Sequence, residues 1–377
     1  MFKKNNFVDL AEVQRAQGTL YCAGLDIHPF GSLKANLEVY GSVIQSDVEK
    51  ERYEALKGVY LLLTQYMPGL NSPRYFAELM SAIEFYLCRL IDILVEKCNI
   101  RVFKPQSAFY EQFGPMGLIL LARIRQHIQI LEQQKNIRLI CILDCKKGDI
   151  STTQAAYFTG LIGDLSKDWG IDYKPYDFDI INVTPWMGDD VLVLKEKEQN
   201  LLGLQMMLYG KGLIIVNKTS NPSGPQYQEL MINGRDKTLQ MCNVEDLYNL
   251  SLKYDLEYEG LSTLGLVVGS THPCDGSIRK LFPSTTLLVP GFGAQGGKFG
   301  LIMPELIRDG KWNGQGAIFS SSRGTMFPFM ENLGGSGKIE NLEIDLIKAI
   351  ENFRINERKA YEDPAVKELG IIYPFAT

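Results

Sequence analysis

The sequence predicts a closed (β/α)8 barrel of the TIM type, and two observations support this prediction. First, eight short apolar segments alternate with longer stretches that are mostly helical in pattern, which is typical of parallel strands joined by helical crossovers. Second, nearly every apolar segment is followed by a polar or charged residue, as at the active-site end of a barrel. The strands are predicted at residues 19–25, 100–103, 138–143, 179–183, 213–216, 264–268, 285–289 and 317–319. An open doubly wound sheet is the alternative architecture.

Helices are predicted between these strands. The first begins at Ser72 and Pro73, a helix start signal, and its apolar residues keep a helical period to about Cys98. The other helical segments are expected at residues 114–134, 153–165, 189–208, 244–253 and 339–353. Residues 28–70 are too long for an ordinary strand-to-helix loop. We therefore expect a single domain spanning residues 1–377, with an insertion at about 31–70 and a C-terminal extension at about 355–377 that covers one barrel end or frays.

Composition excludes several classes of protein. The chain has 377 residues, of which 45% are hydrophobic and 22% are charged, with a net charge of −5. This is an ordinary globular composition, and it offers no basic surface for nucleic acid. The N-terminus does not resemble a signal peptide, and no apolar run approaches the roughly 20 residues of a membrane span. We therefore expect a cytoplasmic protein without nucleic-acid or membrane partners. The seven cysteines and three histidines show no metal-binding spacing, so no metal is expected.

The segment RLICILDCKKGDISTT, residues 138–153, is the most informative part of the chain. Its apolar start is typical of a buried strand, and its end carries Asp144, Lys146, Lys147 and Asp149. Charges at the end of a buried strand are costly unless they pair with one another or with a ligand. In extended chain, Asp144 and Lys146 would point to the same side, whereas Gly148 permits a turn that directs Asp149 elsewhere.

Two interpretations of this segment remain open at this point. One is a lysine held among carboxylates as a proton donor. The other is a solvated loop in which Asp149 and Ser151 cap the next helix. The D-x-K-x-x-D spacing is too short to decide between them.

The other strand ends strengthen the first interpretation. Their polar residues are Asp26, Lys104, Asp144 with Lys146, Asn182 with Thr184, Thr219, Gln295 and Arg323. Barrels often bind phosphate with the loops after strands seven and eight. Here those loops supply the glycine-rich PGFGAQGG, which contains Gln295, and the guanidinium of Arg323. A glycine-rich turn beside a surface arginine is the alternative, but the two features together favour phosphate binding.

Six motifs now resemble those of the orotidine 5′-phosphate decarboxylase family. They are VFKPQSAFYEQFG, LDCKKGDISTT, VTPWMG, NKTSNPSG, VPGFGAQGG and SSSRG, in the family's order and spacing. The chain is most similar to the branch with K-P-x-x-A-F-Y-E and K-T-S-N-P motifs, and the resemblance runs from about Cys22 to Arg323. It implies a (β/α)8 barrel, a homodimer with shared active sites, no cofactor, and conversion of orotidine 5′-monophosphate (OMP) to UMP and CO2, the last step of pyrimidine nucleotide synthesis.

The resemblance also implies roles for individual residues. Lys104, Asp144 and Lys146 match the family's charged network, with Lys146 as the proton donor. The partner subunit would supply the remaining acid, Asp149, together with Thr153. The substrate contacts implied are Asp26 and Lys104 for the ribose, Thr153 across the dimer, Asn182 for the pyrimidine, and Gln295 and Arg323 for the phosphate. Thr184 is also expected to bind substrate, with no particular group assigned to it.

Some positions depart from the family pattern. Asn182 stands where Ser or Thr is more frequent, and Gln106 stands where this branch often has Asn. Lys147 adds a charge at a variable position, where we expect it to face solvent.

These residue types suit a decarboxylation without a cofactor. Loss of CO2 from C6 of the pyrimidine leaves a poorly delocalised carbanion, and the sequence carries no cofactor motif that would supply an electron sink. Preorganised charge must stabilise the carbanion instead, and the ammonium of Lys146 can do so and then donate the proton. Asp144 and Asp149 would favour the charged form of that lysine. Asp144 would also repel the substrate carboxylate until CO2 leaves.

Two other functions are possible on the sequence alone. A metal-dependent barrel enzyme acting on a sugar phosphate can share D-x-K-x-x-D, but such enzymes place a carboxylate at the end of the second strand, where Lys104 stands here. A catalytically silent barrel could use the insertion to bind a partner. The complete set of charged residues argues against this second alternative.

Overall fold

The computed structural model describes residues 4–165, 170–192, 210–271, 274–291 and 298–375. Eight parallel strands form a closed barrel in the order β1-β2-β3-β4-β5-β10-β11-β12, and β1 pairs with both β2 and β12. The strands are β1 Tyr21–Gly24, β2 Val102–Lys104, β3 Ile140–Lys147, β4 Ile180–Val183, β5 Gly212–Lys218, β10 Leu264–Val268, β11 Thr286–Val289 and β12 Ala317–Ser321. The predicted barrel is confirmed, and the open sheet is excluded because the first strand closes on the last.

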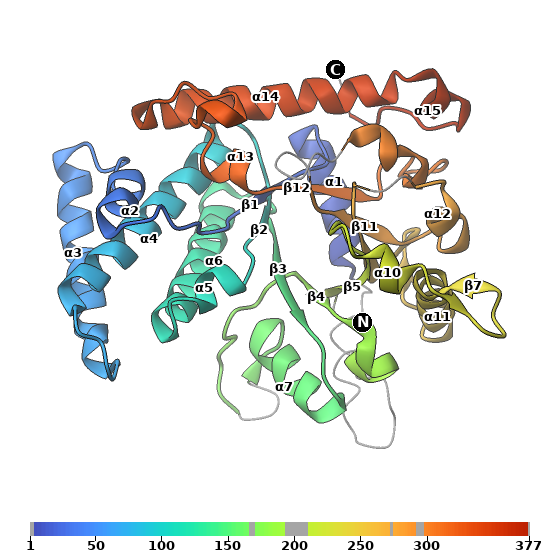
Figure 1. Cartoon of the computed structure of the whole chain (residues 1–377), viewed down its shortest axis with the longest axis horizontal. Helices are drawn as coiled ribbons and strands as arrows, with labels where there is room; N and C mark the ends of the chain where they lie inside the picture. The colour runs from blue at the N-terminus through green and yellow to red at the C-terminus, as the bar shows by residue number, and fades with distance from the viewer. Residues whose placement is uncertain (1–3, 166–169, 193–209, 272–273, 292–297, 376–377) are drawn as a thin grey trace.

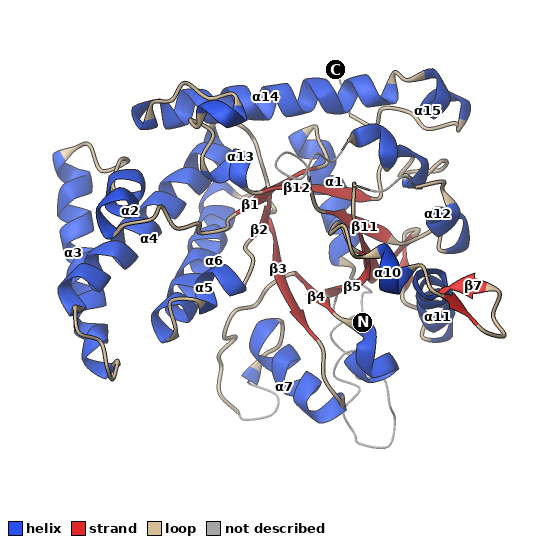
Figure 2. Ribbon diagram, in the orientation of Figure 1, coloured by secondary structure: helices blue, strands red, loops and turns tan. Residues whose placement is uncertain are grey.

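Helices surround the barrel (Figures 1 and 2). The longer ones are α4 Pro73–Glu96, α6 Pro115–Lys135, α7 Ser151–Leu161, α11 Leu239–Lys253 and α14 Leu342–Tyr361. The start of α4 lies at the predicted Ser72-Pro73 signal, and its apolar face is buried along its whole length. The helix predicted at residues 189–208 begins within a 3-10 segment, Pro185–Leu192, and its remainder lies outside the described residues. No helix in the described ranges is long and apolar enough to cross a membrane.

Shorter elements lie in the connections. They are the helices α5 Ala108–Glu111, α10 Pro225–Gln228, α12 Ser277–Leu281, α13 Arg323–Met326 and α15 Pro364–Glu368, and the hairpins β6 Met231–Ile232 with β7 Lys237–Thr238 and β8 Glu257–Tyr258 with β9 Leu261–Ser262. The sequence pattern did not predict these hairpins because each strand has only two residues.

The insertion contains two α-helices, α2 Leu33–Tyr40 and α3 Asp47–Leu63, followed by a 3-10 turn at Thr64–Tyr66. A capping box between Ser46 and Glu49 starts α3. The helix then packs on α4, where the hydroxyl of Tyr60 donates a 2.6 Å hydrogen bond to Glu84. The insertion therefore lies against α4 at the edge of the molecule (Figure 1).

An N-terminal helix that the sequence did not predict, α1 Asn6–Gln17, packs at the N-terminal ends of the strands. Phe7 is fully buried and reaches Gly212 and Gly265, where a β-carbon would lie only 2.8 and 3.1 Å from its ring. The helix was missed because its buried residues include Asn6, Gln14 and Gln17, which blur the amphipathic pattern.

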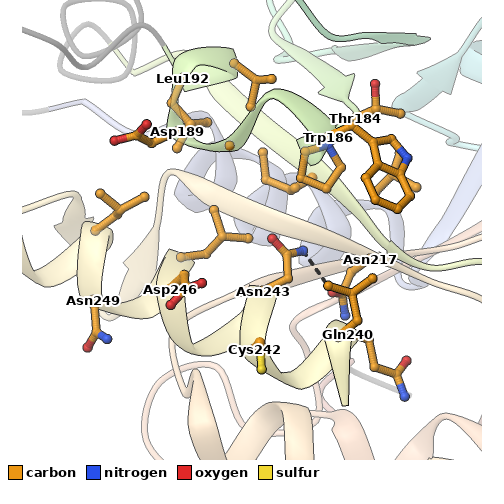
Figure 3. Close-up of a pocket in the computed structure, with 18 of the residues that line it drawn as sticks. Thr184, Trp186, Asp189, Leu192, Asn217, Gln240, Cys242, Asn243, Asp246 and Asn249 are labelled. Atoms are coloured by element: carbon orange, nitrogen blue, oxygen red, sulfur yellow. Dashed lines mark hydrogen bonds between the residues drawn. The ribbon is translucent and has the colours of Figure 1, made fainter. Parts of the chain in front are cut away.

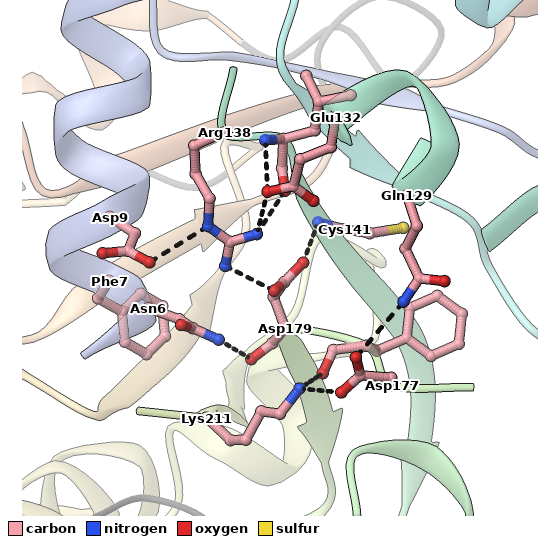
Figure 4. A network of polar contacts seen from close by, with 12 residues as sticks. Asn6, Phe7, Asp9, Gln129, Glu132, Arg138, Cys141, Asp177, Asp179 and Lys211 are labelled. Atoms are coloured by element: carbon pink, nitrogen blue, oxygen red, sulfur yellow. Dashed lines mark hydrogen bonds and ion pairs between the residues drawn. The ribbon is translucent and has the colours of Figure 1, made fainter. Parts of the chain in front are cut away.

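A polar network holds α1 and the neighbouring strands together (Figure 4). The guanidinium of Arg138 donates to Asp9 on α1 at 3.2 Å and to Asp179 beside β4 at 2.7 Å. Asp179 also accepts the backbone N–H of Cys141 on β3. Burial would raise the pKa of Asp179, but the charges of Arg125 and Arg138 lower it overall. These charges lie at the end of the barrel that is associated with stability and not with catalysis.

The described part of the C-terminal extension packs and does not fray. The hydroxyl of Tyr361 donates to the carbonyl of Gly314 at 2.7 Å, and the N–H of Ile372 donates to Asn313 at 3.0 Å. On α14, the buried carboxylate of Glu357 accepts from the hydroxyl of Thr19 at 2.6 Å and from the N–H of Leu20 at 2.8 Å, just before β1. The closing helix is thereby tied to the first strand.

Candidate active site

A polar cavity of about 400 Å³ lies at the C-terminal ends of the strands. It brings together six of the residues that the sequence predicted at strand ends: Asp26, Lys104, Asp144, Lys146, Thr219 and Arg323. They come from five strands or the loops that follow them, so only the closed barrel makes them neighbours.

Two lysines share one carboxylate in this cavity. The Nζ atom of Lys104 lies 3.1 Å from Asp144 Oδ2, and that of Lys146 lies 2.5 Å from Asp144 Oδ1. The side chains of Lys104 and Asp144 are only 5% and 11% exposed, whereas that of Lys146 is 44% exposed. The single chain therefore presents a buried ion pair with a second ammonium at the cavity wall.

Mutual pairing keeps Asp144 and Lys104 ionised. Burial would raise the pKa of Asp144, but the charges of Lys104 and Lys146 hold it well below the ordinary value. Burial would likewise lower the pKa of Lys104, but the carboxylates of Asp144 and Asp26 raise it overall. At neutral pH the site therefore holds an aspartate carboxylate and a buried lysine ammonium.

The end of β3 explains how Asp144 and Lys146 come together. The strand continues through Lys147, beyond the predicted end at residue 143, and its register with β4 shifts between Leu143 and Lys147. Within this irregular stretch Lys146 adopts a left-handed backbone conformation with φ of 49°. The prediction that Asp144 and Lys146 share a side is borne out by their contact.

Lys147 does not fully face solvent, contrary to our expectation. Its side chain is 31% exposed, its Nζ lies 3.4 Å from Glu111, and it stands 5.4 Å from the ring centroid of Tyr157 on α7.

Asp26 presents an unused acceptor at this cavity. The residue is 6% exposed, and its Oδ1 atom has no hydrogen-bond partner among the described residues. Buried oxygens are normally satisfied, so an orphan oxygen on a cavity wall is well suited to a ligand hydroxyl.

Asn182, predicted to contact the pyrimidine, and Thr184, predicted to bind substrate, do not line this cavity. Asn182 is fully buried, and its side-chain amide bonds to Asp144 and to the backbone of Cys145 and Lys146. Thr184 donates to the carbonyl of Lys146 at 3.3 Å and lines a different cavity.

That second cavity, of about 680 Å³, lies between the 3-10 segment Pro185–Leu192, β5 and α11 (Figure 3). Its wall is mostly apolar, and Asn243 donates to Asn217 across it at 2.9 Å. It contains none of Lys104, Asp144 and Lys146.

The single chain does not bring Asp149 or Thr153 into the polar cavity. Asp149 is half-buried and accepts the N–H of Ile150 at 2.7 Å, while Thr153 is exposed on α7. Large apolar side chains nearby are also exposed, with Ile150 at 54% and Trp186 at 74%.

The predicted phosphate end of the cavity is partly described. Arg323 follows β12 at the start of α13, lines the cavity and makes no ion pair with any described side chain. Gln295 lies outside the described residues. The neighbouring Ser322 packs closely against β1 at Gly24. A β-carbon at position 24 would lie only 2.7 Å from the Ser322 backbone, so this close contact requires glycine.

His28, which was not predicted as a site residue, also lines the polar cavity. Its ring meets that of Phe109 edge-on, with centroids 4.6 Å apart. Burial lowers the pKa of His28, and Arg323 acts in the same direction against the opposing effect of Asp26. Its position two residues after Asp26, beyond a predicted strand end, was the available signal.

The architecture is similar to that of solved structures of proteins named orotidine 5′-monophosphate decarboxylase. A structure of orotidine 5′-monophosphate decarboxylase from Plasmodium berghei gives a TM-score of 0.63 at 18% identity, covering 94% of this chain and 98% of that one. A structure of OMP decarboxylase from Leishmania donovani gives a TM-score of 0.54 at 21% identity, covering 93% and 98%. At such low identity these similarities establish the fold.

Sequence comparison goes further than the fold. Residues 82–324 match the model of the "Orotidine 5′-phosphate decarboxylase / HUMPS family". The protein named orotidine 5′-phosphate decarboxylase in Rhodopirellula baltica is 33% identical over 243 residues, 64% of this chain and 72% of that protein. Its namesake in Caldicellulosiruptor bescii is 33% identical over 251 residues, 65% and 73% of the two chains. The chain therefore belongs to the orotidine 5′-phosphate decarboxylase family.

Proposed function

We propose that this chain decarboxylates OMP to UMP and CO2, the last step of de novo pyrimidine nucleotide synthesis. The observation that carries the proposal is the array of Lys104, Asp144 and Lys146 at the mouth of the barrel. An ammonium beside a buried carboxylate is what a reaction that creates and then protonates a carbanion requires.

In this proposal Lys146 is the proton donor. The C6–carboxylate bond breaks, CO2 leaves, and the electron pair stays on C6, where the Lys146 ammonium stabilises it and then transfers a proton. Asp144 holds the ammonium at 2.5 Å and lies close to the departing carboxylate, so the repulsion between the two carboxylates is relieved as CO2 forms. Lys104 holds Asp144 at 3.1 Å and thereby fixes the array before substrate binds.

Other cavity residues supply binding energy away from the reacting carbon. The unpartnered oxygen of Asp26 is placed to accept a ribose hydroxyl, with Lys104 beside it. Arg323 offers a fork for two phosphate oxygens, and Gln295 is proposed as its companion. Such remote contacts hold the ring and close the site around it.

We further propose a homodimer in which each subunit completes the other's site with Asp149 and Thr153. Both residues follow the charge array directly but stay outside the cavity of their own chain. The exposed Ile150, Trp186 and Met187 give this region apolar surface suited to an interface between subunits.

A metal-dependent reaction on a sugar phosphate fits these residues less well. Two ammonium groups already neutralise the Asp144 carboxylate, and the end of β2 presents Lys104 where a metal ligand would be needed. A divalent cation would meet their repulsion at close range.

The test is a spectrophotometric assay of OMP consumption by the purified chain in the presence of EDTA, with UMP identified by chromatography. We expect turnover that EDTA does not change. The matched control is Lys147→Met, a neighbouring lysine outside the polar cavity, which should retain turnover. Failure to form UMP, or loss of activity on chelation, would contradict the proposal.

A further inference from the structure

The pairing of β3 with β4 shifts register at Lys146. From Leu143 to Lys147, four steps along β3 correspond to two steps along β4, from Ile181 to Val183. The extra residues of β3 form a bulge that contains Asp144, Cys145 and Lys146. Bulges beside active sites commonly redirect a side chain, and this one puts Lys146 into the left-handed region at φ of 49°.

One side chain spans this bulge from the opposite strand. The Oδ1 atom of Asn182 accepts the N–H of Cys145 at 2.8 Å and the N–H of Lys146 at 2.7 Å. Its Nδ2 atom donates to Asp144 Oδ1 at 2.6 Å. Asn182 is fully buried on β4 and does not line the polar cavity, so these three contacts hold the bulge that carries Asp144 and Lys146.

We propose that Asn182 is a positioning residue for the decarboxylation, holding the bulge of β3 so that Asp144 and Lys146 face the substrate together. This replaces the pyrimidine contact that the sequence resemblance implied for it. The inference rests on the proposed function for its catalytic consequence, although the contacts themselves do not.

The oxygen and the nitrogen of the Asn182 amide have separate functions. The acceptor end satisfies two backbone N–H groups that the irregular register leaves without a strand partner, and so supports the left-handed conformation of Lys146. The donor end fixes one oxygen of Asp144, the same oxygen that Lys146 contacts. A serine or threonine would have to serve all three partners with one shorter hydroxyl, so the asparagine is specific to this arrangement.

Two variants distinguish the support of the backbone from the contact with Asp144. Asn182→Leu removes both ends of the amide, whereas Asn182→Asp keeps an acceptor for the backbone and places a second carboxylate against Asp144. The matched control is Asn217→Leu, because Asn217 is also buried, stands on the adjacent strand β5 and contacts Asn243 outside the polar cavity.

We expect Asn182→Leu to lower kcat by roughly ten- to a hundred-fold, the loss typical when a hydrogen-bond partner that orients a metal ligand is removed, with KM little changed. Asn182→Asp should shift the acidic limb of the kcat–pH profile to higher pH, because the second carboxylate raises the pKa of Asp144. Asn217→Leu should leave kcat and the pH profile unchanged.

Amide hydrogen exchange supplies a readout that does not depend on turnover. The N–H groups of Cys145 and Lys146 should lose protection in Asn182→Leu and keep it in Asn182→Asp. Unchanged protection in a folded Asn182→Leu protein would overturn the inference, as would a loss confined to KM, which would restore the pyrimidine contact. If wild-type protein forms no UMP, the proposed function fails, while protection of the two amides still tests the structural role of Asn182.

Discussion

Replacing Asp144 should be costly for stability, because its loss leaves the buried Lys104 ammonium without its ion-pair partner. The Lys104 side chain is only 5% exposed and cannot move its ammonium into water, whereas Lys146, at 44% exposed, can rehydrate. Removing one partner of a buried ion pair typically costs about 3–5 kcal/mol. We therefore expect Asp144→Leu to lower the free energy of unfolding by this amount at pH 7, equivalent to a drop in Tm of roughly 4–6 °C for a chain of 377 residues.

The double variant Lys104→Met/Asp144→Leu sharpens this prediction. It removes both charges, so no stranded ammonium remains, and apolar replacements of buried pairs are often neutral or stabilising. The double variant should unfold at higher denaturant concentration than Asp144→Leu, with a coupling energy of up to about 3 kcal/mol, and should lack activity. Chemical denaturation followed by circular dichroism measures all four proteins of the cycle. Additive losses would show that the pair does not interact as the structure indicates.

The same pair predicts a pH dependence. The folded state holds the pKa of Asp144 below its ordinary value, so its stabilising contribution is complete above the unfolded pKa of about 4 and is lost as the pH falls further. The stability difference between wild type and Asp144→Asn should therefore be largest near neutral pH and shrink below about pH 4.

Three further predictions concern other parts of the chain. Arg323→Ala should lower kcat/KM for OMP by on the order of a hundred-fold or more, where each tenfold is about 1.4 kcal/mol. The same variant should leave activity on unphosphorylated orotidine nearly unchanged. Equal losses on both substrates would contradict the assignment of Arg323 to the phosphate. Burial raises the pKa of Glu357 from 4.5 to about 7, so its protonated form is favoured in the folded state and stability should fall as the pH rises between these values, by up to about 3 kcal/mol. Glu357→Gln should flatten the pH profile of the unfolding free energy over this range, and an unchanged slope would contradict the assignment. When the inactive Lys146→Ala and Asp149→Ala chains are refolded together, the mixture should recover roughly a quarter of wild-type activity. Half of the dimers are then mixed, and each mixed dimer has one of its two sites intact. No recovery would argue against sites shared between subunits.

Much of the architecture follows from local sequence. Each strand is a short apolar run bounded by glycine, proline or charge, and these signals depend only on neighbouring residues. The convergence of Asp26, Lys104, Asp144, Lys146 and Arg323 also followed, because a closed parallel barrel brings the carboxyl ends of all its strands to one face. The helix α1 could not be predicted from local sequence. Its buried polar residues form hydrogen bonds with backbone groups far away in the chain, as Asn6 does with the carbonyl of Asp179.

The position of Asn182 could not be predicted for a different reason. Its contacts depend on the register of β3 against β4, and a bulge changes that register without leaving a local signature in the sequence. A residue at a strand end was therefore expected to reach the ligand, whereas Asn182 supports the lysine beside it. Thr184 lies just beyond the shifted pairing and lines the second cavity, and its substrate contact stays a prediction.

The most direct test of the account is turnover of OMP by Lys146→Ala, compared with wild type at equal folded concentration. Lys146 is the exposed member of the array, so its loss should leave Tm within a few degrees of wild type. We predict that UMP formation becomes nearly undetectable while the nucleotide still binds. Substantial UMP formation by this folded variant would contradict the assignment of Lys146 as the proton donor.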